Sequence, residues 1–218
     1  MESMVIPGST ATDLRPLIGN PEAPRVDWRQ AVPVLTGQIV TLREPRLSDA
    51  AALWSMVSNE EVSRFMSAPP SSSAAFERFI AWTHRERAAG NFICFAVVPH
   101  GTEQPVGIFQ IRRLDTDFQT AEWGFAIGSG FWHKGVYGDA ASLVLEFAFN
   151  VIGARRLEAR AAVANTRGNG ALRKVGATRE GVLHGSLEKD GQYFDQGLWT
   201  ILDRDWRRTR VVHSTRIH

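Results

Sequence analysis

The sequence predicts an α/β (α+β) fold with a mixed, largely antiparallel sheet of six to seven strands flanked by helices. Three short apolar strands separated by turns lie at residues 92–98, 106–112 and 121–127, which indicates an antiparallel meander. One crossover helix then leads to a further strand, and a hairpin closes the sheet. A single crossover predicts a mixed sheet rather than a doubly wound parallel one.

The other elements are predicted from periodicity and from residues that start or end them. Residues 47–49 offer a helix N-cap, Gly90 and Gly176 end helices, and Asp190-Gly191 is a hairpin turn. The expected strands outside the meander are 38–43, 156–161, 182–188 and 192–202, and the expected helices are 49–57, 72–89, 139–151 and 165–175.

Three regions follow from this order. Residues 1–36 hold five of the ten prolines without periodicity and are expected to form an extended N-terminal arm that covers a cleft or a partner subunit. Residues 37–206 hold the periodic segments and are expected to form one folded domain. Residues 207–218 carry four arginines and no acid, and are expected to be a basic C-terminal tail.

Composition and charge restrict the function classes. The formal net charge is +2, so the chain without the four tail arginines is at −2 and is not built to lie along nucleic acid. A single cysteine, Cys94, excludes an intrachain disulfide and is expected to be a buried thiol. No apolar run approaches the roughly 18 residues of a membrane span, and no secretory signal is evident, so a cytoplasmic location is expected.

The most informative segment is the glycine-rich loop 128–138, which precedes the apolar helix. Glycines permit close approach of a ligand to the backbone, and the unpaired N–H groups of a helix start form an anion site. Lys134 stands at the mouth of this loop. The loop alone is equally well explained as a tight connection between a strand and a helix.

Two common phosphate-binding loops do not fit this segment. Gly130 and Gly135 have the P-loop spacing, but Val136 and Tyr137 stand where lysine and a hydroxyl residue belong. The dinucleotide fingerprint needs glycine where the chain has His133.

The loop is instead similar to the acetyl-CoA motif of the GNAT superfamily of N-acetyltransferases, Gln/Arg-x-x-Gly-x-Gly/Ala. It most resembles the variant of the ribosomal-protein N-terminal acetyltransferases, with a Trp and a Lys-Gly pair before a long apolar helix. The similarity runs from about Gln38 to Trp206. The segments that carry it include Trp132-His133-Lys134-Gly135-Val136-Tyr137-Gly138, Arg156-Leu157-Glu158-Ala159, Asn165-x-Arg167 and Glu180-Gly181-Val182-Leu183.

This resemblance implies a GNAT-type sheet that is splayed between its fourth and fifth strands, with acetyl-CoA as cosubstrate in the resulting cleft. The pantetheine would pair with the main chain of Phe125, Ala126 and Ile127, and Asn165 would hydrogen-bond to it. The pyrophosphate would lie on the amides of His133, Lys134, Gly135, Val136, Tyr137 and Gly138. Strand-edge amides and a helix start are unpaired groups that such a ligand satisfies.

The sequence departs from the family pattern in its loop and in its general acid. Trp132 replaces the polar first residue, and Tyr137 takes the small-residue position, where a slightly displaced loop is expected. Leu172 stands where a general-acid tyrosine is often found, and Gly168 replaces the serine of the ribosomal branch. No dedicated general acid is therefore assigned. A leaving thiol with a pKa of about 8.5 tolerates protonation by water.

One general base is expected, because attack on a thioester needs a neutral amine. Related N-terminal acetyltransferases place a catalytic glutamate where this chain has Glu122. The alternative is a carboxylate on the solvent face of the strand, or one paired with Arg112 or Arg113. His133 and His184 are interpreted as surface and structural residues, and no metal-ligand spacing is present, so no metal is expected.

The acceptor side is less specific in the sequence. Glu60, Glu61 and Asp195 would attract a cationic amine, although each of them alone is better explained as a solvated surface carboxylate. Phe65, Met66 and Trp82 would line the acceptor cleft or pack in the core.

The leading functional interpretation is acetyl transfer to a protein or peptide N-terminal α-amine in a ternary complex. A small amine acceptor such as a polyamine or an antibiotic stays open, as does a catalytically silent acetyl-CoA-binding module. A nucleic-acid accessory role is disfavoured, because the tail is short and lacks interleaved aromatic residues. The sequence leaves a homodimer open.

Overall fold

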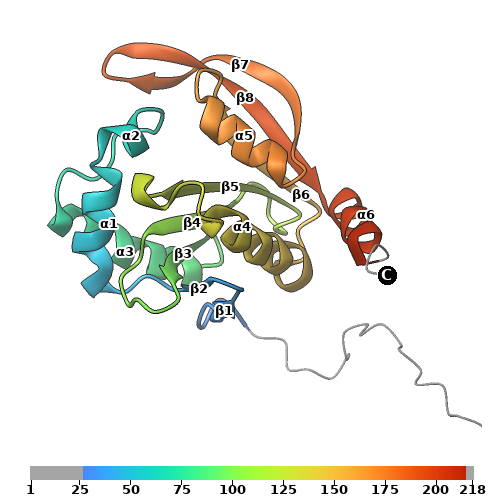
Figure 1. Ribbon diagram of the computed structural model, residues 1–218, viewed down its shortest axis with the longest axis horizontal. Coiled ribbons are helices and arrows are strands. Elements are labelled where there is room, and N and C mark those ends of the chain that lie inside the picture. Colours follow the sequence, from blue (N-terminus) through green and yellow to red (C-terminus); the bar gives the residue numbers. More distant parts are fainter. Residues whose placement is uncertain (1–26, 215–218) are drawn as a thin grey trace, which may run out of the picture.

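The computed structural model describes residues 27–214 and shows a single mixed sheet of eight strands in the order β1-β2-β3-β4-β5-β6-β8-β7 (Figure 1). All neighbouring strands are antiparallel except β5 and β6, which are parallel. The mixed, largely antiparallel sheet is thus confirmed. The sheet has eight strands rather than the expected six to seven. The additional strand is β1, whose two residues are too few to show alternation.

The elements have these bounds. The strands are β1 (Leu35–Thr36), β2 (Val40–Arg43), β3 (Phe92–Pro99), β4 (Gly107–Arg113), β5 (Thr120–Ile127), β6 (Arg156–Ala162), β7 (Thr178–Lys189) and β8 (Gln192–Leu202). The helices are α1 (Ala50–Val57), α2 (Glu60–Ser63), α3 (Ser73–Ala88), α4 (Val136–Phe147), α5 (Thr166–Lys174) and α6 (Asp203–Ser214).

Two elements begin earlier than the sequence predicts. Helix α4 starts at Val136 rather than at 139, because Gly135 has a left-handed backbone and is the N-cap. Strand β7 starts at Thr178 rather than at 182, because a register shift between Arg179 and Gly181 interrupts the alternation that marks a strand.

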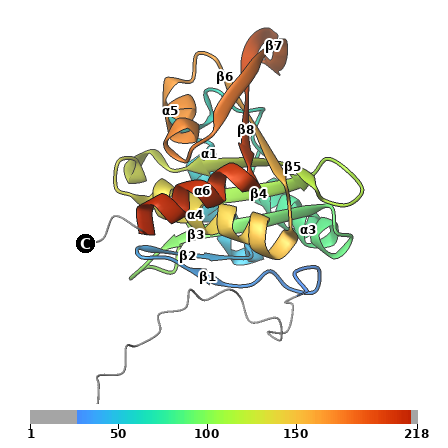
Figure 2. The ribbon, with the colours of Figure 1, turned by 90° about the vertical axis from the view of Figure 1, so that its right-hand side faces the viewer.

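Helices cover both faces of the sheet (Figures 1 and 2). One core cluster joins the sheet to α4, α5 and α6, and a second joins its other face to α1 and α3. Strand β3 lies between these clusters: Phe95 belongs to the first and Cys94 to the second. Burial on both faces explains its continuous apolar run. Cys94 is buried as expected, and burial raises the pKa of its thiol well above the usual range.

Residues 27–36, expected to belong to the extended arm, are part of this core. Trp28 and Val32 are 5% and 7% exposed, and Trp28 meets Phe118 edge to face at 5.6 Å between ring centroids. The prediction that the whole arm stays out of the core is therefore wrong for these residues. The sequence does not predict this burial, because two isolated apolar residues among prolines show neither helical nor strand periodicity. Residues 1–26 lie outside the described residues.

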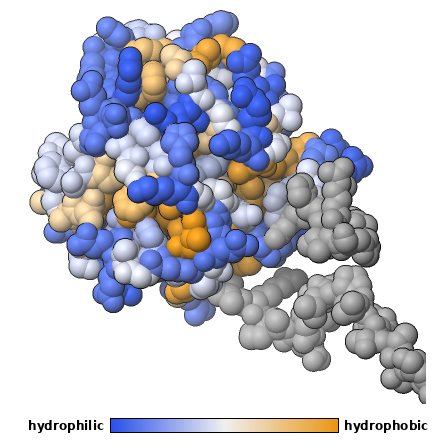
Figure 3. Space-filling view, in the orientation of Figure 1, coloured by the Kyte–Doolittle hydropathy of each residue, from blue (hydrophilic) through white to orange (hydrophobic). Residues whose placement is uncertain are grey.

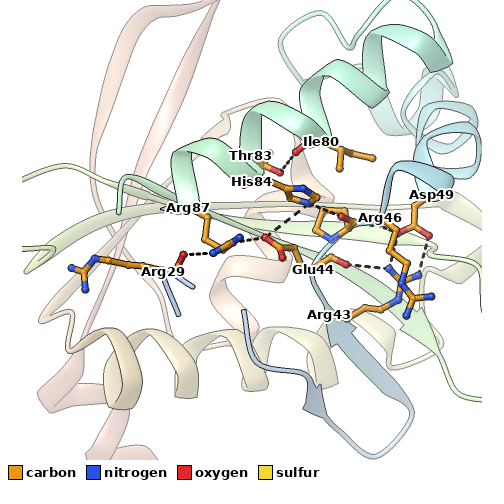
Figure 4. A network of polar contacts seen from close by, with 10 residues as sticks. Arg29, Arg43, Glu44, Arg46, Asp49, Ile80, Thr83, His84 and Arg87 are labelled. Atoms are coloured by element: carbon orange, nitrogen blue, oxygen red, sulfur yellow. Dashed lines mark hydrogen bonds and ion pairs between the residues drawn. The ribbon is translucent and has the colours of Figure 1, made fainter. Parts of the chain in front are cut away.

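A polar network holds this segment to the domain (Figure 4). Arg87 on α3 pairs with Glu44 at 2.5 Å and also donates to the Arg29 carbonyl. His84 lies 2.8 Å from the Pro45 carbonyl. One helix thus fixes both the N-terminal segment and the chain that leaves β2.

The C-terminal region expected to be a tail begins inside a helix. Residues 207–214 continue α6, and Trp206 packs on Phe149 with ring centroids 5.1 Å apart. Residues 215–218 lie outside the described residues. Within residues 27–214 no helix is both long and apolar enough to span a bilayer. On the face shown in Figure 3, hydrophilic residues predominate and hydrophobic residues gather in separate patches.

Candidate active site

The site begins where the two parallel strands separate. Strands β5 and β6 pair only from Thr120 to Glu122. The amide of Gly128 donates to the Val106 carbonyl, so the antiparallel register turns the main-chain groups of Phe125 and Ile127 away from β4. Past Glu122 these groups face the gap, whereas the main chain of Ala126 faces β4.

A helix start lies beside this strand edge. Gly135 precedes α4 with φ +82°, a conformation that favours glycine. No side chain among the described residues caps this helix, which leaves its first N–H groups for another acceptor. The main chain of this loop therefore offers the anion site that the sequence predicts.

A cavity of about 1590 Å³ joins the strand edge, the helix start, α5, α2 and the β7–β8 hairpin. Eight of the ten residues expected to bind cofactor line it: Phe125, Ala126, Ile127, His133, Gly135, Tyr137, Gly138 and Asn165. The side chains of the other two have other contacts. Lys134 lies 5.5 Å from the ring of Phe131, and Val136 is buried in the core.

Tyr137 turns its ring away from the loop. The ring packs on Phe125 and Phe109, with centroids 4.6 and 6.0 Å apart. Its hydroxyl is buried without a hydrogen-bond partner among the described residues, and burial raises its pKa well above the usual range. The large residue at the small-residue position therefore packs against the aromatic side chains of β4 and β5.

Asn165 caps α5 at the cavity wall. Its Oδ1 accepts from the Gly168 amide at 2.9 Å, and its Nδ2 donates to no other described residue. The buried Asn169 fixes the same turn: its Nδ2 donates to the Asn165 carbonyl at 2.7 Å, and its Oδ1 accepts from Trp199 Nε1 at 2.9 Å. The position of Asn165 is thus set by a network that continues into β8.

Glu122 is the last residue of β5 that pairs with β6. Its carboxylate contacts the Arg112 guanidinium across the β4–β5 pair, and Arg160 Nη1 lies 3.7 Å away. Its side chain is 21% exposed, but it does not line the cavity. The pairing with Arg112 is the alternative that the sequence left open for this residue.

The other end of the cavity is formed by α2, the segment after it and the hairpin. Glu61, Phe65 and Met66 line it, together with Phe194 from β8. Lys189 Nζ at the hairpin tip donates to the Ser63 carbonyl at 2.7 Å and joins the two elements, which Figure 1 shows one above the other.

Three other candidates for the acceptor side lie elsewhere. Asp195 accepts from the Gly185 amide at 2.8 Å and contacts His184. The Gly185 amide and then His184 hold the pKa of the Asp195 carboxyl below the usual range. Trp82 packs against Phe92, and Glu60 does not line the cavity.

Sequence reasoning assigned no role to Arg167, which lines the cavity at the start of α5. Its Cζ lies 3.5 Å from the centroid of the Trp132 ring. Trp132 in turn donates from Nε1 to the Ile127 carbonyl at 2.8 Å. The only sequence signal for this contact was the presence of a tryptophan where the family has a polar residue.

Comparison with known proteins identifies the family. Residues 40–178 match the Acetyltransferase (GNAT) domain, a region that runs from β2 through α5. The chain belongs to the GNAT family.

Individual proteins of known sequence or structure are similar to most of the chain. The uncharacterized N-acetyltransferase p20 of Bacillus licheniformis is 24% identical over 168 residues, which are 77% of this chain and 94% of p20. Mycobacterium smegmatis RimJ in complex with CoA-disulfide superposes with a TM-score of 0.71 at 22% identity, over 83% of this chain and 94% of RimJ. The ribosomal-protein-S5-alanine acetyltransferase of Vibrio fischeri gives 0.72 at 16%, over 80% and 98%.

As a member of this family with N-acetyltransferases among its relatives, the protein is an N-acetyltransferase. GNAT acetyltransferases use acetyl-CoA as cosubstrate. The described residues fit that substrate: the gap past Glu122 offers the main-chain N–H and C=O of Phe125 and the N–H of Ile127, whose carbonyl accepts from Trp132, and the α4 start offers free N–H groups. Among residues 27–214 no three His, Cys, Asp or Glu side chains gather as a metal site.

Proposed function

We propose that this GNAT enzyme acetylates the N-terminal α-amine of a protein or peptide in the cytoplasm, by direct attack in a ternary complex. The observation that carries the proposal is a cavity that passes through the sheet. Its walls include α4 and α5 on one face and α2 with its following segment on the other. Two substrates that enter from opposite faces would meet at the gap between β5 and β6.

The volume of the cavity and the side chains at its acceptor end support a peptide acceptor. About 1590 Å³ exceeds the range of roughly 300–1,000 Å³ that is common for a single small ligand. The acceptor end combines apolar side chains, Phe65, Met66 and Phe194, with one carboxylate, Glu61, and one guanidinium, Arg64. This arrangement suits a short peptide with a cationic amine. The names of the structural neighbours that acetylate ribosomal proteins add support.

In the proposed reaction the neutral amine nitrogen forms a C–N bond as the thioester C–S bond breaks. Glu122 accepts one proton from the ammonium before attack. After attack the nitrogen releases its second proton to solvent water, and the departing thiolate takes up one proton from solvent water, so these two cancel. Because Glu122 does not line the cavity, one water molecule relays the proton between the amine and its carboxylate. Arg112 and Arg160 hold the carboxylate at the point where the strands part.

Acid–base chemistry favours an α-amine as the acceptor. An α-amine with a pKa near 7.7–8.0 is about one-tenth neutral at pH 7, whereas a lysine amine near 10.4 is neutral about once in 2,500 molecules. The difference amounts to about 3.5 kcal/mol of deprotonation. A site with one indirect base supplies little of this free energy, so it acts on the amine that needs less.

The test is a peptide that begins with Ser or Ala and carries one internal lysine. Mass spectrometry is expected to show N-terminal acetylation, with kcat/KM at least about tenfold above that for an N-terminally blocked copy, which offers only the lysine. Predominant acetylation of the lysine would contradict the proposal. Turnover of polyamines or aminoglycosides without any peptide acetylation would support a small-amine enzyme instead.

A further inference from the structure

We propose that Arg167, stacked on Trp132, binds the pyrophosphate of the cosubstrate. This inference extends the GNAT assignment and is independent of the acceptor. Arg167 lies on the first turn of α5, and Trp132 lies in the glycine-rich loop, directly before the residues at the start of α4 that line the cavity. The two residues therefore connect the two elements between which the cosubstrate would lie.

The contacts of Trp132 position the Arg167 guanidinium by one of its flat faces. The indole N–H bonds the Ile127 carbonyl at 2.8 Å, which orients the ring. The Arg167 Cζ then lies 3.5 Å from the ring centroid, a distance at which a guanidinium stacks on the aromatic face. Stacking occupies the flat face of the guanidinium and leaves its N–H edge available to an oxyanion.

No acidic side chain competes for that edge within the described residues. Arg167 is exposed, and no carboxylate of residues 27–209 forms an ion pair with it. The α5 wall of the cavity adds Arg173 and Lys174, whereas on the α2 wall the one carboxylate, Glu61, lies beside Arg64. The excess of positive charge on α5 favours an anion beside that helix.

The Trp132–Arg167 pair also accounts for the departure from the family motif. The loop lacks the polar first residue, and Lys134 lies over Phe131 instead of lining the cavity. The cationic group that the loop does not supply comes from α5. An arginine held in this way offers two parallel donors to one phosphate, which a lysine at the same place does not.

The test is calorimetric binding of three ligands, CoA, 3′-dephospho-CoA and pantetheine, without an acceptor. Arg167→Ala is expected to raise the Kd of both CoA forms about tenfold and to leave that of pantetheine unchanged, because pantetheine has no phosphate. Arg167→Lys should recover only part of the affinity. Arg155→Ala, which removes an exposed charge outside the cavity, is the matched control and should change no Kd.

Trp132→Leu tests the stacking itself. It should reproduce the loss, and combined with Arg167→Ala it should add little, because the two residues act as one unit. An unchanged Kd for CoA in Arg167→Ala would overturn the proposal. A loss that vanishes with 3′-dephospho-CoA would also overturn it, because the guanidinium would then bind the 3′-phosphate. Since no acceptor is present, these results are independent of whether peptides are acetylated.

Discussion

At the scale of single residues, Asp139 holds the start of α4 against the chain that enters β2. Its carboxylate accepts the amides of Gln38, Ile39 and Val40 at 3.1, 2.8 and 3.1 Å, across about a hundred residues of chain. These hydrogen bonds hold its pKa below the usual value, against the opposing effect of partial burial. The start of α4 is thereby fixed relative to β2.

Asp139→Asn is expected to lower the free energy of unfolding by about 1–3 kcal/mol near neutral pH, because an amide replaces an ionised acceptor. The folded pKa is depressed, so this stabilisation is fully present above the unfolded pKa of about 3.9 and is lost as pH falls through the folded pKa. Urea unfolding of both proteins from pH 7 to pH 3 measures the difference. Asp117→Asn, at an exposed turn, is the control, and a gap that does not narrow in acid would contradict this account.

Glu122 is the residue on which the proposed proton transfer depends. Glu122→Gln is expected to lower kcat/KM by about 10²-fold at pH 7 and by progressively less as pH rises, because more of the amine is then already neutral. Glu158, directly opposite on β6, provides the matched control Glu158→Gln. A pH–rate profile for the three proteins decides it. Equal activity of Glu122→Gln and wild type at pH 7 would remove Glu122 from the mechanism.

At the scale of elements, Gly135 determines how the loop enters α4. Its φ of +82° is strained for any residue with a side chain, and a Cβ at this position would lie 3.2 Å from Ile39 Cδ1. The expected pyrophosphate site depends on this turn, because the free N–H groups of α4 follow it directly.

Gly135→Val is expected to abolish the rise in melting temperature that CoA gives to the wild type, because a ligand stabilises only the form it binds. Gly153→Val is the matched control. Gly153 has φ +85° at the other end of the same helical region, with no atom near its Cβ position. Both variants should lose some stability, but only Gly135→Val should lose the response to CoA. A normal response in Gly135→Val would show that the loop does not bind the cosubstrate.

At the scale of the whole molecule, the first described segment closes the core beneath α4. Trp28 and Val32 belong to the cluster that contains Phe118 and Phe147. The position of α4 therefore depends on residues that precede the matched family domain.

Trp28→Ala is expected to lower the free energy of unfolding by about 3–5 kcal/mol, because it leaves a cavity that the core fills only in part. Trp82, which is 38% exposed on α3, gives the control Trp82→Ala, for which a smaller loss is expected. Chemical denaturation of both variants compares the two losses. A Trp28→Ala protein as stable as the wild type would mean that this segment only covers the core.

The antiparallel meander, the crossover helix, the closing hairpin and the glycine-rich loop could be predicted from the sequence, whereas β1, α2 and α6 could not. The predicted features have short-range signals, since apolar periodicity, glycines and turn residues act within a few neighbours; the position at which the sheet opens was implied by the resemblance to the GNAT superfamily. The tertiary structure was needed to show that Trp28 is buried, that Glu122 contacts Arg112 and Arg160, and that Arg167 stacks on Trp132. Each of these depends on which side chains distant elements bring together, and rotamers at such contacts are fixed by packing rather than by the local pattern.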